Sequence, residues 1–266
     1  IVDRRERPLA VSIPVKTVYA DPTMIFDGHA ALAAKIGYLF HQDPVRVLKK
    51  IVRHKVRLAS GKKVWDRYEV IARNVSLEDW QSFYEWLREW VQRKKQHLPY
   101  RTRLAYEAML RWGFWTSDNY HREYPNGTLA GQLLGYVQPR TLKVYQQSVW
   151  LEVGRNGVER SWEAELQGRP GLWVNGEEKI VPQDGRTIQL TIDAVVQRIA
   201  EEELDRVGKE FEARRACAIV VRPQTGEILA LANWPPFDPN HPASTKDSEW
   251  NMAISGTFDP GSTMKV

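Results

Sequence analysis

The chain has 266 residues, of which 42% are hydrophobic and 27% charged, and it contains one cysteine. This length and composition predict a globular chain with a substantial core, and they exclude both a disordered protein and a disulfide-stapled scaffold. The net charge is +5, but acidic residues are interspersed with the basic ones and no zinc-finger, RNA-recognition or helix-turn-helix motif accompanies them. We therefore expect no nucleic acid partner.

The first predicted element is extended, because apolar and polar side chains alternate in "IVDRRERPLAVSIPVKTVYADP". Two helices are predicted next, over "ALAAKIGYLF" and "VRVLKKIVRHKV". Asp43 and Pro44 precede the second of these and are suited to its N-cap and first turn. The N-terminal part of the chain is thus expected to mix strands with helices.

A long amphipathic helix is predicted over "LEDWQSFYEWLREWVQRKKQ". Ser76 and Asp79 have the spacing of a capping box at its start. Its apolar face is expected to consist of Trp80, Phe83, Leu87 and Val91. The turn-rich stretch from 169 to 186 that lies further along the chain predicts a boundary between two domains, over 1–180 and 181–266.

Beyond that boundary the pattern predicts a strand, a helix and a β-hairpin. "TIQLTI" alternates as a strand does, and Asp193 can cap a helix whose apolar stripe is expected to be Val196, Ala200, Leu204, Val207 and Phe211. "ACAIVV" and "EILALANW" flank "RPQTG", which has the residues of a turn. Cys217 has apolar neighbours in the first of these strands, so we expect a buried structural thiol.

The last residues, "FDPGSTMKV", contain a candidate for acyl transfer. Ser262 and Lys265 are three apart and would share one face of a helix, where the amine can take the hydroxyl proton during nucleophilic attack. Ser60 and Lys63 have the same spacing, so the spacing alone does not decide between the pairs. The context favours Ser262, because the preceding Pro-Gly would place it in the first turn of a helix, where free N–H groups favour developing negative charge.

Four segments, in this order, resemble the class B penicillin-binding proteins. They are "IVDRRERPLAVS", "REYPNGTLAGQLLGYV", "GVERSWEAELQGRPG", and "RPQTGEILALANWPPFDPN" followed by "FDPGSTMK". Glu6 stands where the family has a turn glycine, which puts that turn in doubt, and Met264 replaces the common phenylalanine. The helix-rich insert and the phrase "YADP" are more similar to the division type than to the elongation type.

The resemblance implies an α+β fold, with an elongated N-terminal pedestal followed by the beginning of a transpeptidase domain. It implies that Ser262 attacks the D-Ala–D-Ala bond of a peptidoglycan stem peptide, with Lys265 as the general base, and that β-lactams acylate the same serine. It further implies a single membrane anchor upstream of residue 1, domains on the outer face of the cytoplasmic membrane, and a SEDS-family glycosyltransferase and division proteins as partners.

The family's S-x-N and K-T-G motifs lie beyond Lys265, so the chain is expected to be a fragment that is inactive by itself. Two alternatives stay open. The fragment could be a noncatalytic interaction module that binds a glycosyltransferase, or the parent could be a β-lactamase or β-lactam sensor. The six histidines are scattered along the sequence, and neither a metal nor an organic cofactor is expected.

Overall fold

The computed structural model describes residues 1–58, 60–144, 147–169, 171–174, 177–181, 183–242 and 248–257. It is a mixture of helices and strands, which confirms the α+β prediction. The chain divides into two compact units. One, the helical unit, is formed by Ile13–His121; the other, the motif unit, combines Ile1–Ser12 with Arg122–Val266.

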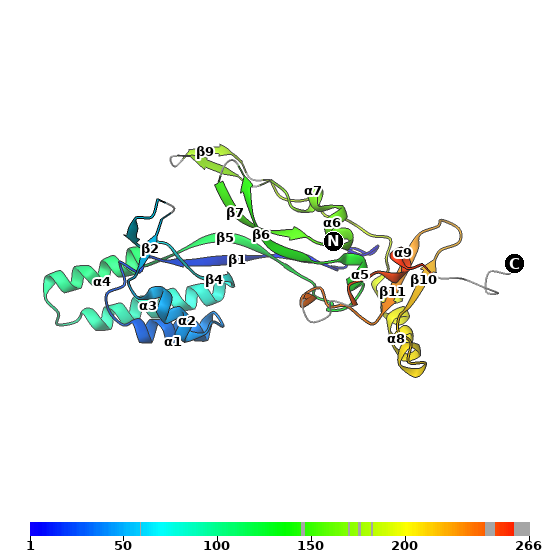
Figure 1. Cartoon of the computed structure of the whole chain (residues 1–266), viewed down its shortest axis with the longest axis horizontal. Coiled ribbons are helices and arrows are strands. Elements are labelled where there is room, and N and C mark those ends of the chain that lie inside the picture. Colours follow the sequence, from blue (N-terminus) through cyan, green and yellow to red (C-terminus); the bar gives the residue numbers. More distant parts are fainter. Residues whose placement is uncertain are drawn as a thin grey trace. The chain divides into compact units, whose positions relative to one another are not determined.

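The helical unit contains a three-stranded sheet with the strand order β4-β1-β5 and helices that pack beside it (Figure 1). Strands β1 and β4 are antiparallel, with Ala20 opposite Glu69. A small hairpin, β2–β3, lies between α2 and β4 in the sequence. In chain order, the elements are β1 (Val11–Ala20), α1 (His29–Leu39), α2 (Pro44–Ile51), β2 (Lys55–Arg57), β3 (Lys63–Trp65), β4 (Glu69–Val75), α3 (Leu77–Lys95), α4 (Tyr100–Trp112) and β5 (Phe114–Glu123).

The predicted helix starts in this unit are confirmed. Asp43 accepts a hydrogen bond from the Val45 N–H at the start of α2, and Ser76 accepts one from the Asp79 N–H at the start of α3. The predicted face of α3 points into the core, where Phe83 is fully buried between the rings of Phe40 and Phe114. The helix predicted over 45–56 is too long, because α2 ends at residue 51 and β2 begins at residue 55.

The motif unit contains two-stranded sheets and several very short helices around a second apolar core. In chain order, its elements are α5 (Gly131–Leu134), β6 (Val137–Val144), β7 (Gln147–Gly154), α6 (Gly157–Ser161), α7 (Glu163–Leu166), β8 (Leu172–Val174), β9 (Glu177–Ile180), α8 (Ala194–Glu210), β10 (Ala216–Val221), β11 (Ile228–Trp234) and α9 (Met252–Ser255).

The predicted hairpin is confirmed as β10–β11, with Ala216 opposite Trp234 and Gly226 in the left-handed region at the turn. The predicted stripe on α8 is wrong in part. Val207 and Phe211 are exposed, whereas Gln197 and Gly208 are the buried residues of this helix. The apolar spacing misplaced the face because a glutamine and a glycine make the closest approach to the hairpin.

Cys217 is exposed, so the prediction of a buried thiol is wrong. Alternate residues of β10 face opposite sides, and Cys217 shares the more exposed side with Ile219 and Val221. The apolar character of the neighbouring residues therefore does not decide whether the Cys217 side chain is buried.

Candidate active site

Ser262 and Lys265, the predicted nucleophile and base, lie outside the described residues. The competing pair is described, and it does not share a helix face. Ser60 is exposed in the turn between β2 and β3, and Lys63 is the first residue of β3. The turn is closed by a 2.9 Å hydrogen bond from the Leu58 N–H to the Lys62 carbonyl. Ser60 therefore lies in a solvated hairpin, which does not provide the desolvation that a neutral lysine base requires.

The segment that leads toward Ser262 is held on a platform formed by α8 and the β10–β11 hairpin. Gln197 is fully buried on α8, and its side-chain amide pairs with both backbone groups of Leu231: Oε1 accepts from the N–H at 2.7 Å, and Nε2 donates to the carbonyl at 3.0 Å. A Cβ at Gly208 would lie 2.6 Å from the ring of Trp234, so only glycine allows this contact. Helix and hairpin are thereby fixed to one another.

Asn233, at the end of β11, holds the short helix α9. Its Oδ1 accepts hydrogen bonds from the N–H groups of Met252 at 2.8 Å and Ala253 at 3.4 Å, and its Nδ2 donates to Asn251 Oδ1 at 3.2 Å. A four-residue helix is unstable by itself, and the first N–H groups of any helix need external acceptors. A single side chain, only 7% exposed, therefore positions the helix that precedes the "FDPGSTMK" motif.

The loop after β11 is bound to the segment that contains "REYPNG". The side chain of Asn240 pairs with both backbone groups of Tyr124, each at 3.0 Å. Phe237 is buried, with its ring centroid 5.6 Å from that of Tyr136. A Cβ at Gly131 would lie 2.1 Å from the Phe237 carbonyl oxygen, which explains the glycine in "TLAG".

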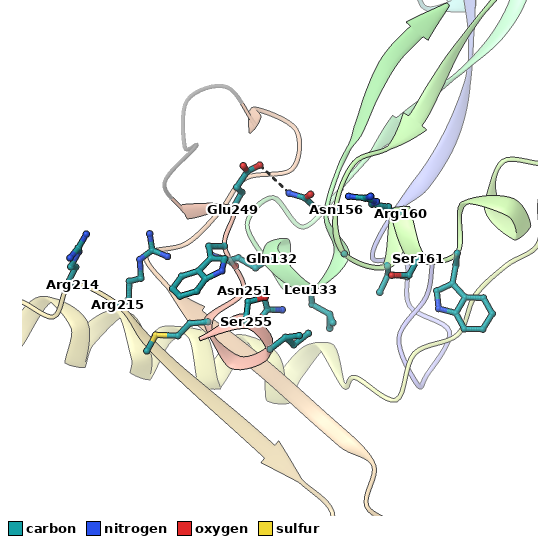
Figure 2. A pocket seen from close by; sticks show the side chains of 16 residues that line it. Gln132, Leu133, Asn156, Arg160, Ser161, Arg214, Arg215, Glu249, Asn251 and Ser255 are labelled. Atoms are coloured by element: carbon teal, nitrogen blue, oxygen red, sulfur yellow. Dashed lines mark hydrogen bonds between the residues drawn. The ribbon is translucent and has the colours of Figure 1, made fainter. Parts of the chain in front are cut away.

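Gln132, in the same segment, and Asn156, just before "GVE", bind the chain around residues 248 and 249. Gln132 donates to the carbonyls of Pro235 at 2.8 Å and Ser248 at 2.9 Å. Glu249 accepts a hydrogen bond from Asn156 at 3.2 Å, as Figure 2 shows. Pro235, Ser248 and Glu249 are therefore bound by side chains that lie 93 or more residues earlier in the chain.

A cavity of about 1280 Å³ lies beside α9, and Figure 2 shows the side chains around it. Three arginines contribute positive charge to its wall, Glu249 contributes a negative charge, and two amides contribute hydrogen-bonding groups. The arginines are Arg160, Arg214 and Arg215, and the amides are Gln132 and Asn156. Its described lining contains serine hydroxyls but no lysine, histidine or cysteine. In the described part of the chain, the cavity can hold a polar or anionic ligand, but it lacks an activated nucleophile.

The second and third motif segments are joined by a buried ion pair. Arg122 Nε donates to Glu159 Oε1 at 2.7 Å, and these side chains are 11% and 4% exposed. The Tyr124 hydroxyl donates to the same oxygen at 3.3 Å. Burial, together with the charge of Glu159, raises the pKa of Tyr124. Arg122, Tyr124 and Glu159, which belong to "REYP" and "GVE", therefore form one hydrogen-bonded group.

The first motif segment binds the start of α8 through a buried carboxylate. Asp3 is fully buried and accepts hydrogen bonds from the backbone N–H groups of Arg5, Arg7 and Ala194 at 2.8–3.1 Å. The Arg7 guanidinium bridges Asp3 and Asp193. Burial alone would raise the pKa of Asp3, but the hydrogen bonds from Arg7 and Ala194 outweigh it, and the pKa is lowered.

The turn that contains Glu6 forms although a glycine is expected there. Glu6 has a φ of 62°, in the left-handed region that favours glycine. Its N–H donates to the Asp3 carbonyl at 3.0 Å, and the Asp3 N–H donates to the Arg7 carbonyl at 2.9 Å. The departure from the family pattern therefore costs conformational energy but preserves the turn.

Sequence reasoning missed the positioning residues Gln132, Gln197, Asn233 and Asn240. One signal was available for two of them, since Gln197 and Asn233 are amides within otherwise apolar patterns, and a buried amide needs a partner. It also missed a group formed by His54, Asp66 and Glu69, whose side chains approach one another in the helical unit.

Comparison with sequence families gives two matches. Residues 1–190 match the model of the penicillin-binding protein dimerisation domain, and residues 216–266 match that of the penicillin binding protein transpeptidase domain. Together the two matches contain all four motif segments.

Curated relatives include the peptidoglycan D,D-transpeptidase FtsI of Escherichia coli K12, which is 29% identical over 282 residues. That alignment covers the whole chain and 40% of the relative. The probable peptidoglycan D,D-transpeptidase PenA of Neisseria gonorrhoeae is 32% identical over 159 residues, which covers 54% of the chain and 25% of the relative. The chain therefore spans less than half the length of these proteins.

Solved structures with a similar fold include penicillin binding protein 2X from Streptococcus thermophilus, with a TM-score of 0.59 and 19% identity over 97% of the chain and 36% of that protein. A complex between PBP2 and MreC from Helicobacter pylori contains a chain with a TM-score of 0.54 and 20% identity, over 90% of the chain and 42% of that protein. At 19–20% identity, these similarities show a shared fold and no more.

Proposed function

Since the chain belongs to the penicillin-binding proteins, through a dimerisation domain that covers residues 1–190, we propose that it is part of a peptidoglycan D,D-transpeptidase. In this proposal Ser262 is the nucleophile and Lys265 is the general base. The substrate is a stem peptide that ends in D-Ala–D-Ala, and β-lactams bind at the same site.

The proposed reaction has two acyl transfers. Lys265, when neutral, accepts the hydroxyl proton while Ser262 Oγ attacks the carbonyl carbon of the D-Ala–D-Ala peptide bond. The bond breaks, the terminal D-Ala leaves with a proton on its amine, and an acyl-enzyme ester remains. An amine of a neighbouring strand then attacks the ester, which forms the cross-link and returns the proton to the serine oxygen. A β-lactam forms a similar ester.

The observation that supports the proposal most directly is the convergence of the four motif segments. The ion pair of Arg122 with Glu159 joins the second and third segments, and the Asn240 side chain joins the second and fourth. The first and second segments are joined by a hydrogen bond from Asn126 to the Pro8 carbonyl at 2.8 Å. Asn233 positions the helix that precedes "FDPGSTMK". Polar side chains that fix the approach to a nucleophile are what acyl transfer requires, because a small displacement of the reacting atoms lowers the rate strongly.

The cellular setting is a further part of the proposal. We infer a single-pass anchor upstream of residue 1, domains on the outer face of the cytoplasmic membrane, and a SEDS-family glycosyltransferase with division proteins as partners. Within the described residues, none of the helices has the length and apolar character needed to cross a bilayer. Support for a septal role comes from the similarity to the peptidoglycan D,D-transpeptidase FtsI of Escherichia coli K12.

The test is covalent labelling of the full-length protein by a fluorescent penicillin. Ser262→Ala should abolish labelling, and Lys265→Arg should nearly abolish it, because a guanidinium stays protonated and cannot act as a base. Ser60→Ala is the matched control and should label as the wild type does, since Ser60 lies in an exposed turn.

Turnover distinguishes the alternatives. A transpeptidase forms a long-lived penicilloyl ester and releases D-Ala from a stem-peptide donor, whereas a β-lactamase hydrolyses penicillin rapidly. Labelling that persists in Ser262→Ala, with a circular dichroism spectrum equal to that of the wild type, would show that another residue is the nucleophile.

A further inference from the structure

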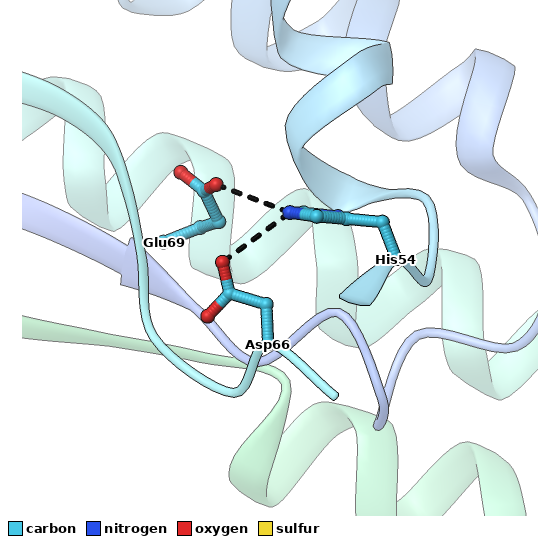
Figure 3. Close-up of side chains that lie close together, drawn as sticks. All are labelled: His54, Asp66 and Glu69. Carbon is cyan, nitrogen blue, oxygen red and sulfur yellow. Dashed lines mark ion pairs between the residues drawn. The ribbon is translucent and has the colours of Figure 1, made fainter. Parts of the chain in front are cut away.

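The helical unit contains a group of three potential metal ligands, which is independent of the proposed acyl transfer. His54 follows the C-terminus of α2, Asp66 follows β3, and Glu69 is the first residue of β4. Figure 3 shows the imidazole edge of His54 pointing between the two carboxylates. One nitrogen and two oxygens lie within 4.8 Å of one another, so a single cation could contact all three.

The two distances from the histidine nitrogen to the carboxylate oxygens are those of ligands around a small divalent cation. His54 Nε2 lies 3.3 Å from Asp66 Oδ2 and 3.4 Å from Glu69 Oε1. A charge-assisted hydrogen bond from a nitrogen to a carboxylate is shorter, at about 2.7–2.9 Å. In contrast, two ligands at about 2.0–2.1 Å from a tetrahedral zinc ion are about 3.3–3.4 Å apart. The two observed separations therefore match those of ligands on one zinc ion, and they also lie within the range of an ion pair.

Two of the three ligands are oriented by hydrogen bonds on the atoms that face away from the group. His54 Nδ1 lies 2.9 Å from the Val52 carbonyl oxygen, to which it can only donate. In the neutral ring this leaves the lone pair on Nε2. Asp66 Oδ1 accepts the Tyr68 N–H at 3.0 Å, which leaves Oδ2 toward the histidine. Outer hydrogen bonds of this kind accompany metal ligands in proteins generally.

The charges around the group also favour a cation between the carboxylates. The carboxylates of Asp66 and Glu69 both face the His54 nitrogen, so their negative charges favour a cation between them. Three nearby cations each make another contact, although the charge of Lys50 also acts on Glu69. Lys50 donates to the Val70 carbonyl, and the side chains of Arg53 and Lys55 lie over the ring of Trp65.

A protonated His54 could also occupy this position as an ion-pair partner, and its pKa is raised by the hydrogen bond to Val52 and by the two carboxylates. The separations of 3.3 and 3.4 Å are compatible with that arrangement too, so zinc titration distinguishes the ion pair from the metal site.

We propose that His54 Nε2, Asp66 Oδ2 and Glu69 Oε1 bind one Zn²⁺ ion, with water completing the coordination. Imidazole together with carboxylate favours zinc over magnesium or calcium, which prefer oxygen ligands alone. The side chains are 34%, 12% and 23% exposed, so the ion can enter from solvent.

The role of the ion is structural. The three ligands come from the end of α2, the base of the β2–β3 hairpin and the start of β4, and the Asp66 N–H already donates to the His54 carbonyl at 3.0 Å. Coordination of one ion by these three segments would fix the hairpin. The outer part of the hairpin contains the basic residues Arg57, Lys62 and Lys63. Zinc therefore stabilises the position of a basic hairpin on the helical unit.

The experiment is zinc titration of the tag-free, chelator-treated protein by calorimetry, together with thermal unfolding. We expect one Zn²⁺ per chain at this site, much weaker binding of Mg²⁺ and Ca²⁺, and a melting temperature that rises by several degrees at a hundredfold excess of zinc over Kd. His54→Ala, Asp66→Asn and Glu69→Gln should each weaken zinc binding by roughly tenfold or more.

The matched controls are His29→Ala and Glu85→Gln, which change the same residue types outside the group and should bind zinc as the wild type does. Asp66→Asn and Glu69→Gln keep the size of the side chain, so they remain informative if His54→Ala does not fold. Absence of zinc binding in the wild type, or unchanged affinity in folded Asp66→Asn and Glu69→Gln, would show that the group is only an ion pair and would overturn the proposal.

Discussion

In the helical unit, the core is a large cluster of apolar side chains, and among its described residues the buried polar ones are Thr17 and Asp21. In the described part of the motif unit, the apolar cluster is smaller, and the buried polar residues are Asp3, Gln132, Glu159, Asp193, Gln197 and Asn233. Most of these polar groups link segments that are far apart in the sequence.

The difference follows from the lengths of the elements. Helices α3 and α4 are long enough to present apolar faces, so hydrophobic burial alone can hold them together. Helices α5, α6, α7 and α9 have four or five residues and present hardly any face. Buried polar side chains therefore tie three of these helices to distant segments: Gln132 on α5, Glu159 on α6, and Asn233 against α9.

The largest expected effect is in the helical unit. Phe83→Ala should lower its free energy of unfolding by about 3–5 kcal/mol, because a fully buried ring is removed from between Phe40 and Phe114. Urea unfolding measures this loss. Tyr100→Ala, at a ring that is 67% exposed, is the control and should change the stability by less than about 0.5 kcal/mol. Similar losses in both variants would contradict the packing that distinguishes this unit.

In the motif unit, removing one partner of the buried ion pair should have the next largest effect. Arg122→Met should cost about 3 kcal/mol, because Glu159 stays buried without its counter-charge. The double variant Arg122→Met with Glu159→Leu should be more stable than the single one, since it removes the unpaired charge. Urea unfolding of the single and double variants measures both values. A double variant that is less stable than the single one would mean that these residues act independently.

Acid should destabilise the motif unit through Asp3 and Asp193, whose pKa values are both lowered from 3.8 in the folded chain. A lowered folded pKa contributes stability that is present above 3.8 and is lost as the pH falls through the folded value. Asp3→Asn should cost about 1.5–3 kcal/mol at pH 7 and flatten the acid limb of the stability profile. Urea midpoints between pH 2 and pH 7 measure this. If the variant loses stability in acid as steeply as the wild type does, Asp3 is not a source of the acid sensitivity.

The smallest expected effect is a gain. Glu6→Gly should stabilise the motif unit by roughly 1 kcal/mol, because glycine adopts the left-handed conformation at this turn without strain. Thermal unfolding should show a small increase in melting temperature. Glu6→Ala retains a Cβ and should show no such gain. Equal stability of the glycine and alanine variants would mean that the turn is not strained.

The sequence by itself determined most of the helix starts and the β10–β11 hairpin. Asp43, Ser76 and Asp193 cap the helices as predicted, because capping depends on residues that are close in sequence. The motif resemblance likewise identified the family, since the order of four segments is a property of the sequence alone. The roles of Ser262 and Lys265 stay predictions from the same source.

Only the tertiary structure decided which side chains meet across long separations. The buried face of α8 follows from the pairing of Gln197 with Leu231 and from the contact of Gly208 with Trp234, and neither appears in a pattern of apolar spacing. The approach of His54 to Asp66 and Glu69 depends on where α2 ends and on how the β2–β3 hairpin closes. Local sequence sets local conformation, whereas such contacts depend on the packing of whole elements, which no local pattern contains.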